Sequence, residues 1–201
     1  MIVFVLGTSA EAIKVRPVIQ RLRNRGVDIE IWSTYQHTDA LDTALNALGL
    51  PRPAFGFARG ARGKAIEKPG QMIPWLASAI GSLLRNRKQL RQRLGERPLI
   101  VIHGDTVTTV FGAFAAKVLR APSAHIEAGL RSGKLFRPFP EEIDRRITGR
   151  VANIHFAPNA DAASNLRRKD VIDTGRNTAI DGVLHTLDTA VRPVGAELQS
   201  P

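Results

Sequence analysis

The sequence lacks cysteine, is poor in aromatic residues and contains no long apolar run, and each shortage excludes a class of protein. Without cysteine, the 201-residue chain can form neither disulfides nor thiolate metal sites. Only 5% of the residues are aromatic, which leaves little surface for stacking nucleic-acid bases. No apolar segment reaches the roughly 20 residues that span a bilayer. We therefore expect a cytoplasmic protein that binds neither nucleic acid nor membrane.

The first residues also lack the features of a secretory signal. Residues 2–7 are apolar, but no basic region precedes them and a strand-then-loop pattern takes the place of a cleavage site. We interpret residues 2–7 as a buried strand of a parallel sheet.

The most unusual property that the sequence does have is its positive charge. There are 29 Lys and Arg residues against 18 Asp and Glu, a net charge of +11. Such an excess favours an anionic substrate or an acidic protein partner. The densest basic stretch, residues 85–93, has helical periodicity, and we interpret it as a solvated helix face.

Apolar residues alternate between strand and helix periodicity along the chain. Strands are predicted at residues 2–7, 27–32, 98–103, 123–127, 153–157 and 171–174. Helices are predicted at 10–25, 39–49, 71–95, 107–120, 140–152, 159–168 and 178–190, with loops at 51–70 and 129–139. This order predicts an α/β fold, a doubly wound, Rossmann-like parallel sheet. We expect one domain over residues 1–190 and a linker-like C-terminal tail over 191–201.

The first strand-to-helix turn is a candidate anion site. It places a helix N-terminus at the carboxyl edge of the predicted sheet, where negative groups are favoured. Its single glycine, Gly7, matches neither a dinucleotide fingerprint nor a phosphate-binding loop. Thr8 and Ser9 are either ligands or the helix N-cap. Lys14 either reaches a phosphate or lies on the surface.

Two predicted neighbouring strands each carry a histidine two residues before a carboxylate. These pairs are His103 with Asp105 and His125 with Glu127. Alternation in a strand predicts that each histidine shares a face with its acid, and parallel strand tips meet at one edge. Two carboxylates in one cleft suit one acid and one base. Alternatively, Asp105 is a helix N-cap, or the four side chains bind zinc or manganese.

A third acidic segment opens the predicted helix 140–152. Pro140 lies at the helix start, followed by Glu141 and Glu142 in the first turn, where the helix dipole favours acids. Glu141 either completes the acidic cleft or only stabilises the helix. Glu141 and Arg145 are four residues apart, so they also fit a surface ion pair.

Together these segments resemble the UDP-N-acetylglucosamine 2-epimerase family, from residue 1 to about residue 185. The matching strings are Gly7-Thr8-x-x-Glu11-Ala12-Ile13-Lys14, His103-Gly104-Asp105-Thr106, His125-Ile126-Glu127-Ala128-Gly129-Leu130-Arg131-Ser132, Pro138-Phe139-Pro140-Glu141-Glu142, Asp144-Arg145-Arg146, His155-Phe156-Ala157-Pro158 and Thr174-Gly175-Arg176-Asn177-Thr178-Ala179-Ile180-Asp181.

The resemblance implies a fold and a reaction. The family has a GT-B architecture, two Rossmann-like domains with the active site between them, and this chain is equivalent to one half. The implied reaction is epimerisation at C2 of a UDP-N-acetylhexosamine by elimination and re-addition of UDP. It converts UDP-GlcNAc to UDP-ManNAc, or releases ManNAc and UDP. It implies neither a metal nor a cofactor.

The resemblance also assigns site residues by position. The family's catalytic carboxylates match Asp105, Glu127 and Glu141. The residues that match substrate-binding positions, or lie beside them, are Thr8, Ser9, Lys14, His103 and Arg145.

The sequence departs from the family at several places. Ser9-Ala10 stands where the family has Arg-Pro, and Arg176 is inserted within the family's T-G-N-T string. The second GT-B domain, with its uridine pocket and catalytic histidine, is absent from the 201 residues. We therefore expect a UDP-sugar substrate and a second protein chain carrying the C-terminal half, or a homo-oligomer.

These departures set out the expected activity and its alternatives. We expect the isolated chain to be weakly active or inactive, with the positive charge helping to dock an acidic partner. One alternative is an inactive binding or regulatory module of a sugar-nucleotide pathway. The other is a metal-dependent hydrolase that uses His103, Asp105, His125 and Glu127.

Overall fold

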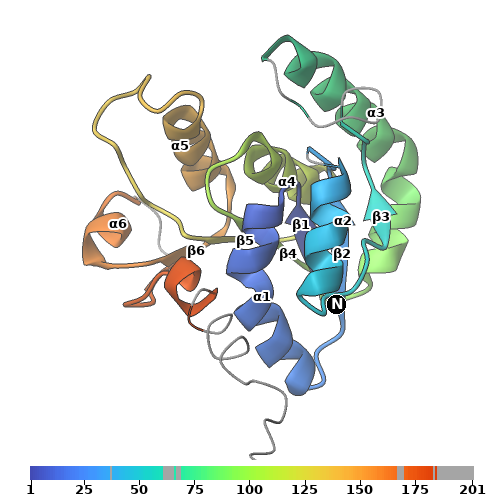
Figure 1. Ribbon diagram of the computed structural model, residues 1–201, viewed down its shortest axis with the longest axis horizontal. Coiled ribbons are helices and arrows are strands. Elements are labelled where there is room, and N and C mark those ends of the chain that lie inside the picture. The colour runs from blue at the N-terminus through green and yellow to red at the C-terminus, as the bar shows by residue number, and fades with distance from the viewer. Residues whose placement is uncertain (37, 61–65, 67–68, 167–169, 183, 185–201) are drawn as a thin grey trace, which may run out of the picture.

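The computed structural model describes every residue except 37, 61–65, 67–68, 167–169, 183 and 185–201. Strands and helices alternate along the chain (Figure 1). The described strands form one seven-stranded sheet in the order β3-β2-β1-β4-β5-β6-β7, and each neighbouring pair in this order is parallel. The strands are β1 (Ile2–Leu6), β2 (Ile29–Ser33), β3 (Phe55–Gly56), β4 (Leu99–His103), β5 (Ser123–Ile126), β6 (Ile154–Ala157) and β7 (Val171–Asp173). The helices are α1 (Ser9–Asn24), α2 (Thr38–Ala47), α3 (Pro69–Leu94), α4 (Val107–Val118), α5 (Glu141–Val151) and α6 (Ala160–Ser164).

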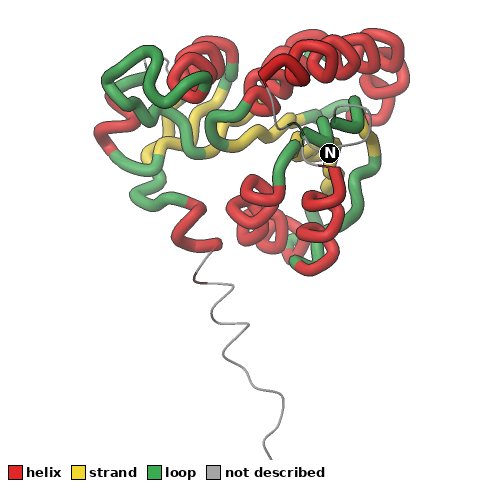
Figure 2. Tube along the Cα trace, turned by 45° about the horizontal axis from the view of Figure 1, so that its top comes forward, coloured by secondary structure: helices red, strands yellow, loops and turns green. Residues whose placement is uncertain are grey.

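Helices cover both faces of the sheet, as Figure 2 shows. Alternate side chains of β1 enter two separate cores, because successive residues of a strand point to opposite faces. Val3 and Val5 pack with α3 and α4, whereas Phe4 and Leu6 pack with α1 and α2. The doubly wound, Rossmann-like fold predicted from the sequence is therefore confirmed.

The order of the strands places a crevice at the carboxyl edge of the sheet. From β1 the chain winds outward through α1 to β2, whereas β4 leads through α4 to β5 on the other side of β1. The loops after β1 and β4 consequently diverge, which is where open α/β sheets bind their ligands.

One predicted loop is wrong in part. Residues 51–70 contain the two-residue strand β3, and α3 already begins at Pro69. The strand forms because Phe55 and Phe57 pack edge-on against each other and against Trp32 of β2. So short a strand between Gly- and Pro-rich segments has too few residues to show a period.

The C-terminal part of the chain departs less from the prediction. The helix expected at 159–168 is α6, which ends at Ser164. The helix expected from 178 starts there, and residues 178–182 and 184 are helical. The tail predicted at 191–201 lies outside the described residues, so the domain limits stay predictions. Within the described ranges, no helix is long and apolar enough to cross a bilayer.

Close packing of α4 on the sheet gives a first prediction. A Cβ added to Gly112 of α4 would lie 2.5 Å from Cγ2 of Ile102, whereas one added to Gly81 of α3 would meet nothing within 4 Å. We expect Gly112→Ala to lower the free energy of unfolding by about 1–3 kcal/mol through overpacking. Gly81→Ala, the control, should raise it by about 0.5–1 kcal/mol through helix propensity. Urea unfolding measures both, and equal effects of the two variants would contradict the packing.

Candidate active site

A buried carboxylate joins the two turns that border the crevice. Glu11 of α1 accepts hydrogen bonds from the backbone N–H of Gly7 (2.7 Å) and of Thr8 (3.1 Å) and from Oγ1 of Thr106 (2.6 Å). Burial raises the pKa of Glu11 above its ordinary value, although these hydrogen bonds partly offset the shift. The loop after β1 is thereby fixed to the loop after β4.

This arrangement shows the capping role of Thr8. Thr8 is the N-cap of α1, and its side chain accepts a hydrogen bond from the Glu11 N–H in a capping box. The N–H groups of Gly7 and Thr8, which a bound anion would need, are already taken by Glu11. Ser9 starts the helix at the rim of the crevice, half-buried.

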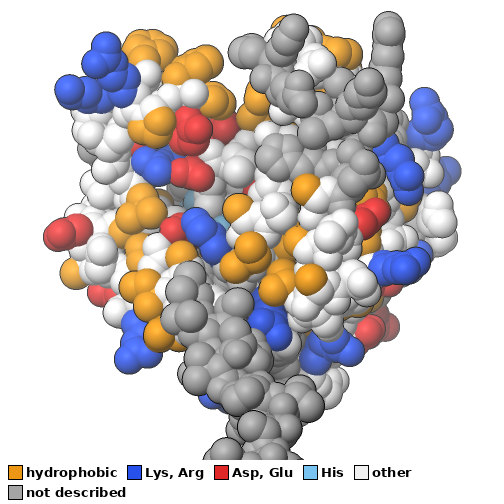
Figure 3. All heavy atoms as spheres, viewed as in Figure 1, with side chains coloured by type: hydrophobic (Ala, Val, Ile, Leu, Met, Phe, Trp, Pro, Cys, Tyr) orange, Lys and Arg blue, Asp and Glu red, His pale blue; other side chains and the backbone are white. Residues whose placement is uncertain are grey.

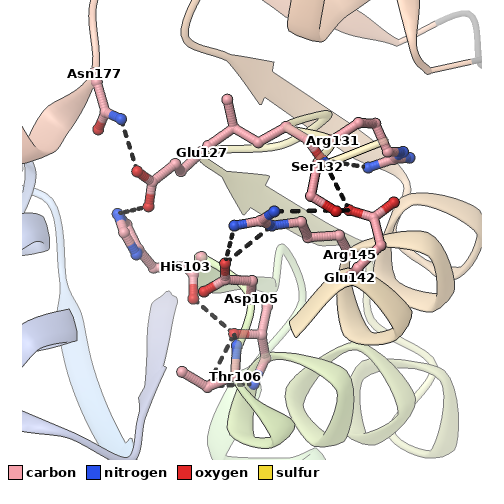
Figure 4. A network of polar contacts seen from close by, with 12 residues as sticks. His103, Asp105, Thr106, Glu127, Arg131, Ser132, Glu142, Arg145 and Asn177 are labelled. Carbon is pink, nitrogen blue, oxygen red and sulfur yellow. Dashed lines mark hydrogen bonds and ion pairs between the residues drawn. The ribbon is translucent and has the colours of Figure 1, made fainter. Parts of the chain in front are cut away.

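Glu127 is the centre of a second network, formed just after β5. Its Oε2 lies 3.0 Å from Nζ of Lys14, and its Oε1 accepts a hydrogen bond of 2.7 Å from Nδ2 of Asn177. The ring of His103 lies beneath it, with Nε2 3.6 Å from the same Oε2 and 3.1 Å from Oγ1 of Thr178. Figure 4 shows Asn177 and His103 approaching this carboxylate from opposite sides.

The backbone of Glu127 is unusual as well. Its φ is +65°, in the left-handed region that costs a non-glycine residue about 1–3 kcal/mol. Burial acts to raise the pKa of its carboxyl, but His103, Asn177 and Lys14 together hold that pKa below its ordinary value. Glu127 is therefore an ionised carboxylate that the surrounding groups keep in a strained position.

The two histidines of the strand pattern have different roles in the structure. Burial lowers the pKa of His103 to about 4, despite the nearby Glu127, so the ring is neutral at pH 7. Burial also lowers the pKa of His125, to about 3, and its Nε2 donates a 2.7 Å hydrogen bond to the carbonyl of Gly104. His125 thus supports the loop after β4 from below.

The prediction that each histidine shares a face with its own acid is wrong. Alternation stops where the strands end, because Gly104 and Glu127 both have a positive φ, of +73° and +65°. His103 consequently meets Glu127 of the neighbouring strand, and Asp105 turns toward α5. Among the described residues, no three histidine or acidic side chains are placed to hold a metal, so the predicted four-residue metal site is not assembled.

Asp105 belongs to a third network, built on α5. Its Oδ2 accepts hydrogen bonds from Nη2 (2.6 Å) and Nε (2.9 Å) of Arg145. The N-cap of α4 is Thr106, so the interpretation of Asp105 as the cap is wrong. Arg145 also approaches Glu142, which is fully buried and accepts hydrogen bonds from Ser132 and Arg146. The surface pair expected between Glu141 and Arg145 is replaced by these contacts.

Glu127 lies close to the turn that contains Asp105. A Cβ built on Gly104, next to Asp105, would lie 3.6 Å from Oε2 of Glu127. Figure 3 shows acidic and basic side chains gathered around a hollow in the middle of this face. Glu127 also lines a cavity of about 340 Å³ on the side of α1 and residues 174–181. Both acids thus follow neighbouring strands at the carboxyl edge of the sheet, and their action as a pair stays a prediction.

Two further acids lie at the start of α5. Glu141 is the first residue of the helix, and Asp144 lies one turn later with 6% of its surface exposed. Within the part of the chain that the structure describes, Oε2 of Glu141 and Oδ2 of Asp144 are buried without a hydrogen-bond partner. Burial, and then the charges of Glu141 and Asp105, raise the pKa of Asp144 to about 7.

Sequence reasoning missed four residues of these networks as site residues: Glu11, Glu142, Asn177 and Thr178. The spacing Thr8-x-x-Glu11 is a capping-box pattern and could have assigned Glu11 to the turn. The segment 174–181 matched a family string, but no local pattern showed what Asn177 and Thr178 contact, because those residues lie 50 and 75 positions away along the chain.

Comparison with known proteins places the chain beside one family. A family model described as UDP-N-acetylglucosamine 2-epimerase matches residues 20–199. The UDP-N-acetylglucosamine 2-epimerase of Bacillus subtilis is 35% identical over 193 residues, which are 94% of this chain and 47% of that protein. The Escherichia coli K12 enzyme of the same name is 34% identical, over 92% of this chain and 47% of that protein. The chain thus spans about half the length of the curated relatives it matches.

Solved structures agree with this comparison. The UDP-GlcNAc 2-epimerase of Methanocaldococcus jannaschii, in complex with UDP-GlcNAc and UDP, superposes with a TM-score of 0.76 at 31% identity. The match covers 96% of this chain and 51% of that one. An α/β fold equivalent to one half of such a protein is therefore confirmed.

The buried acid of α5 gives a prediction on stability. Because the folded chain resists ionisation of Asp144, stability is present at low pH and is lost as the pH rises from 3.8, the ordinary pKa, through about 7. We expect Asp144→Asn to remove this loss, so that its advantage over the parent grows by up to about 1 kcal/mol per pH unit in that window. Thermal unfolding at a series of pH values between about 4 and 8 measures this difference. Asp28→Asn, at an exposed position, is the control, and parallel stability curves for parent and Asp144→Asn would contradict the expectation.

Proposed function

The chain belongs to the UDP-N-acetylglucosamine 2-epimerase family, and from that premise we propose that it contributes the acidic wall of an active site that inverts C2 of a UDP-N-acetylhexosamine. The observation that carries the proposal is the placement of Glu127. An ionised carboxylate is held in a strained backbone conformation at the carboxyl edge of the sheet, where Figure 4 also shows the Asp105–Arg145 pair. Strain of this kind is concentrated at functional sites.

The proposed chemistry needs what these networks contain. One carboxylate removes the C2 proton while the C1–oxygen bond breaks, which gives a C1=C2 double bond and UDP. A second acid then returns a proton to the opposite face of C2, and UDP, or water in a hydrolysing enzyme, adds to C1. Glu127 is the ionised base, and Asp105 and Glu141 are the further carboxylates of the cleft. Acids in different surroundings suit such paired roles.

Positive groups complete the site. Lys14 and Arg145 each neutralise one acid in the absence of substrate, and each is partly exposed, with 35% and 18% of its side chain accessible. Both are thus within reach of a phosphate that enters the crevice, and the charge of the leaving UDP would be stabilised there. His103 is neutral and buried, so it positions Glu127 through packing and through its contact with Thr178.

We further propose that a UDP-sugar binds only when a second body of protein covers this wall. The matched relatives are about twice as long as this chain, and their remaining length has no counterpart in it. A separately encoded chain that carries that half, or a homo-oligomer, would supply the missing contacts. The net charge of +11 favours an acidic surface on that partner.

A second candidate function is a binding or regulatory module of a sugar-nucleotide pathway. It is supported by the first turn, where the neutral pair Ser9-Ala10 adds no cation and Glu11 occupies the backbone N–H groups. Substitution of the acids by amides separates the two candidates, because a module that only binds does not need an ionised base.

Exchange of the C2 proton tests the catalytic proposal directly. With the chain and its partner half assembled, we expect Asp105→Asn and Glu127→Gln each to slow deuterium incorporation at C2 of UDP-GlcNAc in D2O by about 10²-fold or more. Glu30→Gln, which removes a carboxylate paired with Arg93 away from the crevice, should leave the rate unchanged. The isolated chain should show little exchange. Proton NMR measures the rate, and full exchange by the isolated chain, or by both amide variants, would contradict the proposal.

The hydrogen bond from Asn177 gives a prediction on pH dependence. Asn177→Ala removes a donor to the ionised form of Glu127, so the pKa of that carboxyl should rise. A hydrogen bond to a charged group is worth about 1.5–3 kcal/mol, so the acidic limb of the kcat/KM profile should move up by about one to two pH units. Asn86→Ala is the control, since Asn86 donates to Ser82 within α3. A limb that stays in place would show that Asn177 does not act on Glu127.

A further inference from the structure

A cavity of about 650 Å³ lies between α5 and α6, on the other side of α5 from Asp105. Its walls include three arginines, Arg131 from the segment after β5 and Arg146 and Arg150 from α5. Arg145 and Arg146 are adjacent in sequence, so the helix turns them about 100° apart. Arg145 consequently reaches Asp105, and Arg146 faces the cavity. In Figure 4, Arg131 lies beyond Glu142 as seen from Asp105.

Positive charge is in excess around this cavity. Burial lowers the pKa of the Arg131 guanidinium, Glu142 opposes that shift, and the charges of Arg146, Arg145 and Arg150 lower it further. Glu142 is the one acid that acts on it among the described residues, and this carboxylate already accepts hydrogen bonds from Ser132 and Arg146. Like charges crowded at a partly buried site are stabilised when an anion binds.

The remaining polar side chains of the cavity are occupied. Ser164 donates to the carbonyl of Asp161, and Asn165 donates to the carbonyls of Gly129 and Asp161. Arg131 uses one Nη1 bond for the carbonyl of Leu130. What the cavity offers a ligand is therefore guanidinium N–H groups, whose planar fork matches the oxygens of a phosphate.

Gly149 borders this space close to Arg131. A Cβ added there would lie 3.4 Å from Nη2 of Arg131 and 3.3 Å from Cδ2 of Leu166. We propose that this cavity is a second anion site, which binds a dianionic phosphate group on the guanidinium groups of Arg131 and Arg146. The site is separate from the crevice at Glu127 and does not depend on the activity proposed above.

Binding of inorganic phosphate to the full chain tests the proposal. We expect phosphate to raise the unfolding temperature above that in chloride of equal ionic strength. Arg146→Gln should raise the dissociation constant for phosphate at least tenfold. Arg21→Gln, at an exposed position on α1, is the control and should leave that constant unchanged. Glucose 6-phosphate in a parallel titration distinguishes a site for free phosphate from one that accepts a phosphate monoester.

A second variant keeps the test independent of Arg146, whose loss also removes a bond to Glu142. Gly149→Asp would place a carboxylate beside Arg131, so it should abolish the phosphate response while the chain without phosphate stays at least as stable. Gly149→Ala, the control, should retain the response. A phosphate shift no larger than that in chloride, or one that persists in both Arg146→Gln and Gly149→Asp, would overturn the proposal.

Discussion

The position of the Glu127 carboxylate depends on groups that come from distant parts of the chain. Lys14 reaches it from α1, His103 from β4 and Asn177 from the segment after β7, and the residue itself follows β5. A left-handed backbone at a non-glycine residue persists only where its surroundings compensate for it. The charge of Lys14 and the hydrogen bond from Asn177 provide that compensation. They act together only when β1, β4 and β5 are neighbours in the sheet, so the geometry of this site requires the whole fold.

The sequence predicted the fold well because its main determinant is local. Strands such as Leu99–His103 are continuous apolar runs, and helices such as Ser9–Asn24 repeat their apolar residues with a helical period, so each element is visible within its own segment. Strand β3 escaped because two residues cannot show a period, and it depends on aromatic packing against Trp32. The placement of both acids at the sheet edge followed from the same local signals. The side-chain partners did not, because they are set by the turns beyond the strands, where Gly104 and Glu127 leave the extended conformation.

Charge is distributed unevenly over the two sides of α5. On the side of the crevice, Arg145 faces the acids Asp105 and Glu142, so positive and negative groups are close to balance. On the side of α6, Arg131, Arg146 and Arg150 line a cavity, and Glu142 acts on Arg131 and pairs with Arg146. One helix therefore separates the acids of the crevice, which we propose to transfer protons, from the arginines that we propose to bind an anion. The buried Glu142 contacts both sides, because its Oε2 lies 3.6 Å from Nη1 of Arg145 and its Oε1 accepts a hydrogen bond from Arg146.

The two acids of the crevice are supported in different ways, and this has a consequence for movement. Asp105 is tied through Arg145 to α5, which packs on α4. Glu127 is tied to α1 and to the segment that contains Asn177 and Thr178, the last described part of the chain to contact the site. A displacement of that segment would release the hydrogen bond to Glu127 and the contact to His103 together, while leaving the Asp105–Arg145 pair in place. Because a lost donor raises the pKa of a buried carboxyl, such a displacement would change the protonation of one acid without moving the other.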